Sequence, residues 1–85
     1  MDTAQFDLAI ATALRGKRGE KSLTLQAIAD LAGIPVTTME RYFKGTRPIP
    51  ASKLVAVSDA MNVPVGEIIE SAKNILARSE QQQGI

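Results

Sequence analysis

The stretch TLQAIADLAGIPVTTMERYFKG, residues 24–45, decides the fold of this chain. It opens with Thr24, a residue type that caps helix N-termini, followed by apolar side chains at helical spacing. Gly33 ends this pattern, because glycine adopts the positive φ found after many helices. Pro35 suits the start of a second helix, since a first-turn residue does not need its N–H. We therefore expect one helix after Thr24, a tight turn at residues 33–35 and another helix over about residues 36–44.

The two helices each have an inner and an outer face. The inner positions carry apolar side chains: Leu25, Ile28, Ala29, Ala32, Met39 and Tyr42. Ala29 has to be small, because the two helices approach most closely there and a larger side chain would overpack the contact. Two helices joined this tightly cross at a steep angle, which pushes the second one outward, where its polar face can enter a DNA major groove.

The rest of the chain predicts three more helices and no strand. An N-terminal helix, capped by Asp2 or Thr3, is expected to end at Gly16 and Gly19. Its apolar face comprises Phe6, Ala9, Ile10, Ala13 and Leu14, and Leu8 falls off that face. After an extended connector at residues 46–50, a further helix is expected over about residues 51–61, with a break at 62–64.

A last helix is expected from about Val65 to about Ser79. Its apolar stripe is formed by Val65, Ile68, Ile69, Ala72, Ile75 and Leu76. Residues 80–85 have nothing to bury except Ile85 and are expected to be a frayed tail. The prediction is a single all-α domain of five helices over residues 1–79, with a helix-turn-helix formed by the second and third.

Composition limits the possible functions. The chain has 85 residues without cysteine or histidine, which excludes disulfides, thiolate or imidazole metal sites and histidine acid-base catalysis. Residues 16–19 are too short for a phosphate-binding loop, and no nucleophile and base pair is recognisable. No apolar run approaches the roughly 18 residues of a membrane span, and the N-terminus does not resemble a signal peptide. We expect a cytoplasmic protein that is not an enzyme and has no cofactor, metal, membrane partner or small-molecule ligand.

Charge is unevenly distributed along the chain. Residues 15–53 hold eight basic and three acidic residues, a net charge of +5, whereas residues 1–14 and 54–85 each carry −2. Such asymmetry can guide a polyanion onto one face of the molecule. The alternative is a solvated rim with cations favourably placed near helix C-termini.

Residues 24 to about 69 resemble the Cro and phage-repressor family of helix-turn-helix regulators, also called the XRE family. The matching features are Thr24, Ile28-Ala29, Ala32-Gly33-Ile34, Met39 six residues after Gly33, Gly45 with Arg47-Pro48, and Leu54 to Met61 followed by Asn62-Val63-Pro64-Val65. The resemblance implies a five-helix, repressor-like domain that binds double-stranded operator DNA, commonly as a homodimer.

The resemblance also implies which residues touch DNA. Those facing base edges are Val36, Thr37, Thr38, Glu40 and Arg41, and those facing phosphate are Thr24, Gln26, Lys44, Thr46, Arg47 and Lys21. Arg41 can donate two hydrogen bonds to guanine O6 and N7. Alternatives remain at two positions: Arg41 as a phosphate contact or surface charge, and Val36 as plain packing at the helix start.

The chain departs from the family pattern at several points. Leu25 replaces a glutamine that often braces the DNA contact, so Gln26 or no residue takes that role. Phe43 replaces an acidic residue that often pairs with an arginine of the first helix, so an aromatic contact, or a partly exposed ring, is expected instead. Thr37 and Thr38 are short, which makes DNA shape a plausible part of the specificity.

Two further questions stay open in the sequence. Arg15, Lys17, Arg18 and Lys21 either extend the grip on phosphate or belong to an ordinary solvated loop. The stripe of the last helix, through Ala72, Ile75 and Leu76, either forms a dimer interface or folds back onto the chain's own first helix.

The residues predict a transcriptional regulator of bacterial or phage type, nucleoid-associated and repressor-like. The alternative is a protein-interaction adaptor or anti-repressor on the same helical scaffold.

Overall fold

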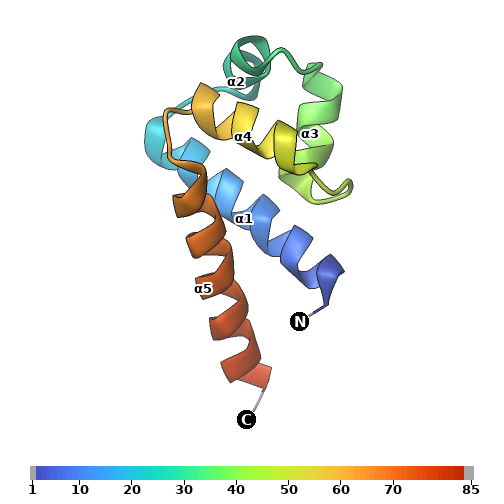
Figure 1. Cartoon of the computed structure of the whole chain (residues 1–85), viewed down its shortest axis with the longest axis vertical. Coiled ribbons are helices and arrows are strands. Elements are labelled where there is room, and N and C mark those ends of the chain that lie inside the picture. The colour runs from blue at the N-terminus through green and yellow to red at the C-terminus, as the bar shows by residue number, and fades with distance from the viewer. Residues whose placement is uncertain (1, 84–85) are drawn as a thin grey trace.

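The computed structural model describes the backbone of residues 2–83 and the side chains of residues 2–79, and within this part the chain is all-helical. Five helices follow one another without a strand among the described residues (Figure 1). Their bounds are α1 Thr3–Lys21, α2 Leu25–Ala32, α3 Val36–Lys44, α4 Ala51–Ala60 and α5 Val65–Gln83. The expected order of five helices, with α2 and α3 as the helix-turn-helix, is confirmed.

Helix α1 is longer than the sequence predicted. Asp2 caps its start, its side chain accepting a hydrogen bond from the backbone N–H of Ala4 at 3.1 Å. The expected end at Gly16 and Gly19 is wrong, since the helix continues through both to Lys21. Each glycine costs a helix about 1 kcal/mol, but the residues around them are strong helix formers and α1 is held along its length by α5 and α3. The helix ends instead at Ser22, which adopts the left-handed conformation with φ 55°.

The turn between α2 and α3 follows the sequence signals closely. Thr24 caps α2 by accepting a hydrogen bond from the N–H of Ala27 at 3.1 Å. Gly33 has φ 70°, and the next N–H, that of Ile34, returns to the carbonyl of Ala29 at 3.1 Å. Pro35 precedes the first helical residue of α3 and provides no side-chain cap. The turn is therefore closed by backbone geometry alone.

Helix α4 ends at Ala60, one residue before the expected end, because Met61 serves as its cap. Asn62 turns the chain in the left-handed region at φ 57°. The N–H of Val63 then bonds the carbonyl of Ser58 at 2.9 Å. This short break starts α5 almost immediately after α4.

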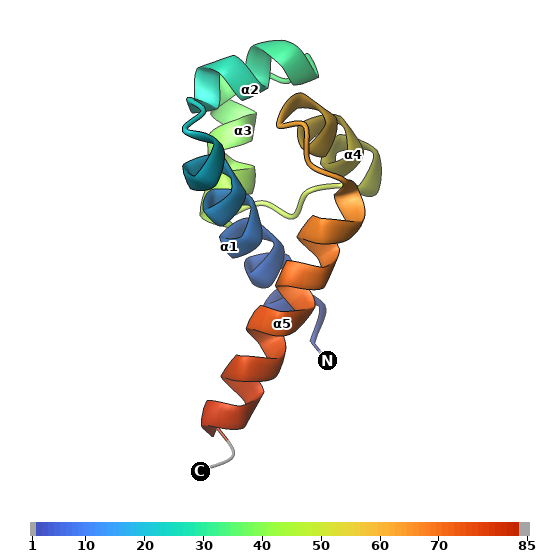
Figure 2. The same cartoon turned by 90° about the vertical axis from the view of Figure 1, so that its left-hand side faces the viewer.

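Helix α5 runs to Gln83, four residues beyond the expected end near Ser79. Residues 80–83 of the expected tail are thus helical, because Glu-Gln-Gln-Gln has good helix propensity and no breaker precedes Gly84. Gly84 and Ile85, the rest of that tail, lie outside the described residues. The C-terminal half of α5 extends past the other helices, giving a molecule with a longest dimension of 43 Å (Figures 1 and 2).

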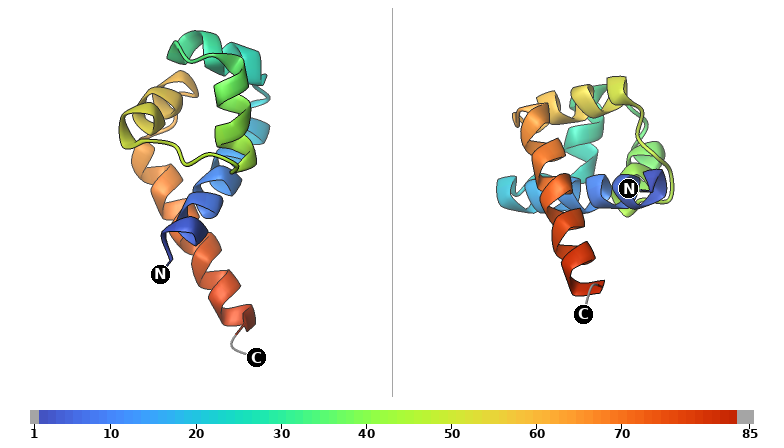
Figure 3. Two further views of the ribbon diagram at one scale, coloured as in Figure 1. Left: turned by 90° about the vertical axis from the view of Figure 1, so that its right-hand side faces the viewer. Right: turned by 60° about the horizontal axis from the view of Figure 1, so that its bottom comes forward.

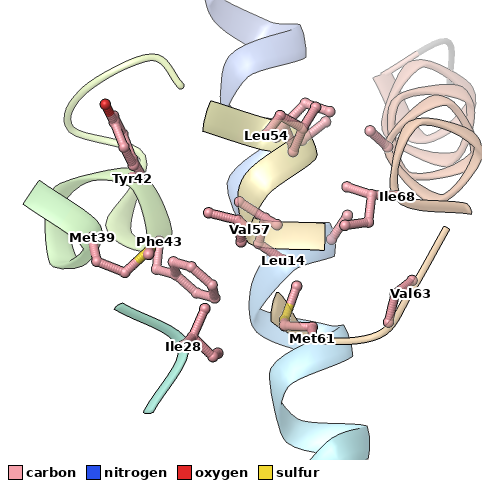
Figure 4. Packing of buried hydrophobic residues seen from close by; sticks show 14 of the residues in the cluster. Leu14, Ile28, Met39, Tyr42, Phe43, Leu54, Val57, Met61, Val63 and Ile68 are labelled. Atoms are coloured by element: carbon pink, nitrogen blue, oxygen red, sulfur yellow. The ribbon is translucent and has the colours of Figure 1, made fainter. Parts of the chain in front are cut away.

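One apolar core joins the helices. Side chains of all five helices converge on it (Figure 4). The largest fully buried side chains of the described residues are Leu14, Ile28, Met39, Val57, Ser58, Met61 and Ile68. Ser58, the buried polar residue among them, donates its hydroxyl to the carbonyl of Val55 at 2.9 Å. Helix α1 packs on both α5 and α3, so it connects the protruding helix with the helix-turn-helix.

None of the described helices is both long and apolar enough to cross a membrane.

Candidate nucleic-acid interface

Helix α3 lies at the edge of the molecule, and its outer side is not covered by another described helix (Figures 1 and 3). Its buried side chains are Met39, Tyr42 and Phe43. At about 100° per residue, Thr37, Arg41 and Lys44 fall on the opposite side of the helix, within about 60° of one another. All three are exposed. They form the outer face of α3, a name kept below for Thr37, Arg41 and Lys44.

The other expected base-contacting residues lie on the flanks of this outer face. Val36 is half-buried and packs partly against the core, as its packing alternative anticipated, and Thr38 is half-buried as well. Glu40 is exposed on the flank toward α1 and α2. The structure thus brings all five residues onto one helix but gives them unequal access to solvent.

The side chain of Arg41 is available for binding. It is exposed, and its guanidinium makes no hydrogen bond or ion pair with any described residue. Its backbone carbonyl, by contrast, accepts hydrogen bonds from the N–H groups of Gly45 at 3.0 Å and Thr46 at 3.1 Å. The backbone at Arg41 is fixed, while the charged end points into solvent.

The phosphate-contacting residues expected on α2 already have partners. The hydroxyl of Thr24 accepts from Ala27, and Nε2 of Gln26 donates to the Asp30 carboxylate at 2.8 Å. Leu25, at the position where the family often has a glutamine, is half-buried against the core. Gln26 beside it is exposed and is therefore the polar side chain nearest that position. Its second amide proton stays free to donate.

The segment after α3 carries the other expected phosphate contacts. Lys44, Thr46 and Arg47 are all exposed. Thr46 bonds the Arg41 carbonyl through its hydroxyl at 3.4 Å, and neither Lys44 nor Arg47 forms an ion pair within the described part of the chain. Lys44, within the outer face of α3, and Arg47 beyond it therefore leave two unpaired cations near the C-terminal end of the helix, among the described residues.

Most of the basic residues near the end of α1 form ion pairs or hydrogen bonds with other residues of the chain. Residues 16–21 are helical, so the alternative of a solvated loop there is wrong. Nζ of Lys17 lies 3.5 Å from a Glu20 carboxylate oxygen and 3.7 Å from one of Glu67. Arg18 donates to the carbonyl of Leu23 at 3.1 Å. Of the expected phosphate contacts on α1, Lys21 is exposed and without an ion pair among the described residues.

Phe43 is buried, so the expectation of a partly exposed ring is wrong. Arg15 of α1 nevertheless reaches this position, because its guanidinium donates a hydrogen bond to the backbone carbonyl of Phe43. The family's ion pair is thus replaced by a side-chain contact to backbone. Sequence reasoning missed this contact, since a carbonyl acceptor exists at every residue and leaves no signal in the sequence.

A shallow cavity of about 170 Å³ lies beside α3, between α1 and α2. Its lining comprises Arg15, Arg18, Leu25, Glu40, Phe43 and Lys44. Three cations face one carboxylate there, so the flank of α3 beside Glu40 has an excess of positive charge.

The apolar stripe of α5 is largely used within the monomer. Ala72 and Leu76 are buried, and α5 packs along α1, so these two residues fold back onto the chain's own first helix. Their side chains are covered within the monomer, and their place in a dimer interface stays a prediction. Ile75 is half-buried and lines a groove of about 190 Å³ together with exposed Leu8.

Within the described residues, no three acidic side chains come close enough together to hold a metal ion.

Comparison with known proteins agrees with this geometry. Two curated proteins, each described as an uncharacterised HTH-type transcriptional regulator, are 29% identical over 67 residues; they come from Sinorhizobium medicae and Rhizobium meliloti. The aligned part is 79% of this chain but 48% of each relative, so the chain spans about half the length of the curated relatives it matches.

The fold also occurs in a solved structure. The clp gene regulator ClgR from Corynebacterium glutamicum superposes with a TM-score of 0.87 and 22% identity, over 93% of this chain and 84% of that one. A second crystal structure of the same regulator gives a TM-score of 0.78 over 81% of this chain and 90% of that one. At this identity the likeness shows a shared fold. The family model described as helix-turn-helix matches residues 14–68, and the chain belongs to that family, in its XRE-type branch.

Proposed function

We propose that this protein is a sequence-specific, double-stranded DNA-binding transcriptional regulator that acts at the nucleoid, in the cytoplasm. The observation that carries the proposal is the outer face of α3, where Thr37, Arg41 and Lys44 project together and the Arg41 guanidinium has no partner among the described residues. A helix of this kind, held by a preceding helix and a tight turn, fits a B-DNA major groove. Bound at a promoter, it blocks or recruits polymerase.

Base recognition is assigned to the centre of α3. Arg41 donates a pair of hydrogen bonds to guanine O6 and N7, a contact worth about 1–3 kcal/mol of discrimination. Thr37 places its methyl group against a thymine methyl. Thr38 and Glu40, on the flanks, meet neighbouring bases as the helix settles into the groove, and Val36 adds apolar contact at its entrance.

Phosphate binding is assigned to both sides of α3. On one side, Lys44 ends α3 and Thr46 and Arg47 follow it. On the other side, Lys21, Thr24 and Gln26 lie around the start of α2. The free N–H groups at the N-terminus of α2 favour an anion there. These contacts set affinity and register, whereas Thr37 and Arg41 set sequence preference.

We further propose that the protein binds DNA as a homodimer. The support is the groove between α1 and α5, where Leu8 is 54% exposed next to half-buried Ile75. Association of two copies through this groove removes apolar surface from water. A two-fold dimer presents two α3 helices to half-sites about 34–36 Å apart, so its operator is an inverted repeat.

A protein-interaction adaptor or anti-repressor is the second candidate function. One observation favours it: Leu31 on α2 is 71% exposed beside a shallow cavity between α2 and α4. An exposed leucine next to a hollow surface suits a partner protein. An adaptor, however, does not require binding to duplex DNA that weakens steeply with salt.

Selection of duplexes from a random pool tests the proposal. We expect recovery of an inverted repeat and an affinity that falls with salt by about 0.9 log units per log unit for each phosphate neutralised. Arg41→Ala is expected to cost about 1–3 kcal/mol on the selected duplex and to remove the preference at one base position, with an unchanged circular dichroism spectrum. Arg78→Ala is the matched control, because Arg78 is an exposed arginine on α5. Recovery of no motif, or equal effects of the two variants, would contradict sequence-specific binding through α3.

A further inference from the structure

Arg15 joins α1 to the end of α3 through both of its terminal nitrogens. Nη1 donates to the backbone carbonyl of Phe43, in the last turn of α3. Nη2 donates to Oγ1 of Thr12 at 3.1 Å, and this hydroxyl donates to the carbonyl of Leu8 at 3.0 Å. A continuous series of hydrogen bonds therefore runs from the backbone of α1 to the backbone of α3.

The acceptor on α3 is one that the helix leaves without a partner. The last four carbonyls of a helix have no intrahelical N–H to bind. In α3, the carbonyls of Arg41 and Tyr42 accept from the N–H of Gly45, and the carbonyl of Phe43 accepts from Arg15. A cation in this place also favours the negative end of the helix dipole.

No other hydrogen bond joins a side chain of another helix to α3 within the described residues. The N-terminus of α3, at Pro35, has no side-chain cap. Apart from the packing of its buried side chains, the orientation of α3 relative to the other helices is therefore fixed by one hydrogen bond from another helix among the described residues. Arg15 donates that bond.

We infer that Arg15 is a positioning residue: it sets the angle of α3 so that Thr37 and Arg41 reach base edges, and it does not itself bind phosphate. The inference rests on the proposed DNA-binding function. Hydrogen bonds weaken steeply as their geometry departs from linear, so a small rotation of α3 costs base contacts more than it costs contacts to phosphate. Arg15 directs two of its five N–H donors at Phe43 and Thr12, which fixes the orientation of the guanidinium toward α3. The test below therefore separates a positioning role from a phosphate contact made by the other three donors.

The test compares Arg15→Met and Arg15→Lys on the duplex selected by the unaltered protein and on a scrambled duplex, across a salt series. We expect both variants to lose about tenfold in preference for the selected duplex, equivalent to about 1.4 kcal/mol. Lysine fails because a single ammonium cannot reproduce the two-armed geometry of the guanidinium. The salt slope of Arg15→Met is expected to stay unchanged. A slope lower by about 0.9 with an unchanged preference, or full activity of Arg15→Lys, would identify a phosphate contact and overturn the inference.

Thr12→Val is a matched variant whose effect cannot come from the loss of a charge, because threonine and valine are both uncharged. It removes the anchor of Nη2, so we expect a smaller loss of preference in the otherwise unaltered protein and no further loss in the Arg15→Met background. All variants are measured at a temperature where circular dichroism shows them fully folded. Lower melting temperatures with unchanged preference would reduce Arg15 to a stabilising residue and overturn the inference. If the unaltered protein itself prefers no duplex, the proposed function fails and the inference fails with it, an outcome distinct from the others.

Discussion

Gly45 ends α3 at a point where the backbone conformation disfavours a side chain and the space for one is tight. Its φ is 82°, and a Cβ placed there would lie 2.9 Å from Cδ2 of Leu8 and 3.3 Å from Cβ of Ala11. Gly33 shares the left-handed conformation, with φ 70°, but a Cβ there meets no atom within 4 Å. Gly45→Ala is therefore expected to lower the free energy of unfolding by about 2–3 kcal/mol and Gly33→Ala by about 1–2 kcal/mol.

Urea denaturation of the two variants measures this difference. Equal losses would show that the end of α3 can move away from α1, in contradiction to a close contact at Gly45. A larger loss in the free energy of unfolding for Gly45→Ala than for Gly33→Ala supports a close contact at Gly45. The strain of a positive φ is common to both positions, whereas the steric contact occurs only at Gly45.

At the residue scale, the sequence distinguished some roles and not others. The turn positions were predictable, because a positive φ selects glycine and the residue type itself carries the signal. The role of Arg15 inside the molecule was not predictable, because Arg15 and Arg41 are both arginines at the surface of a predicted helix. What separates them is a carbonyl of Phe43 within reach of Arg15, which only the packing of α1 against α3 brings there.

At the scale of elements, the continuation of α1 through Gly16 and Gly19 can be tested by substituting these two glycines. Gly16 and Gly19 are exposed in the helix interior, and a Cβ at either meets nothing within 4 Å. Gly16→Ala and Gly19→Ala are each expected to raise the free energy of unfolding by about 0.5–1 kcal/mol, since alanine restricts the unfolded chain and suits a helix. Thermal unfolding followed by circular dichroism measures the gain. A loss of stability, or none gained by either change, would indicate that α1 ends before Gly16.

Helix ends were predictable only where a local signal and the packing agree. The bounds of α3 and the start of α2 follow from Thr24, Gly33 and Gly45: the Thr24 side chain caps the start of α2, and the two glycines adopt a positive φ before and after α3. The end of α1 was misplaced because glycine is a weak stop signal that tertiary packing overrides. The end of α5 was misplaced because polar residues without a breaker continue a helix even with nothing to bury.

At the scale of the whole molecule, α1 and α5 form a pair of long helices, and the helix-turn-helix packs on α1 through α3 and on α4 through α2 (Figure 2). The Lys17 ammonium, 3.7 Å from the Glu67 carboxylate, adds an ion pair between them. The sequence could not decide how the stripe of α5 is used, because an apolar stripe has the same spacing whether it packs on its own chain or on a second one. Burial of Ala72 and Leu76 in the monomer shows that these two residues pack on their own chain.

The division of α5 between core and groove predicts two separable effects. Leu76 is 7% exposed and also lines the groove, so Leu76→Ala is expected to lower the free energy of unfolding by about 2–4 kcal/mol, mainly through packing lost within the monomer. Leu8→Lys changes an exposed side chain and is expected to alter stability by less than about 0.5 kcal/mol. If two copies associate through the groove beside Ile75, Leu8→Lys instead places a charge in the contact and shifts dissociation to higher concentration. Sedimentation equilibrium and urea denaturation over a range of concentrations measure both quantities. Association that survives Leu8→Lys would place the dimer contact elsewhere, and a concentration-dependent effect of Leu76→Ala would show that this leucine contacts the second copy after all.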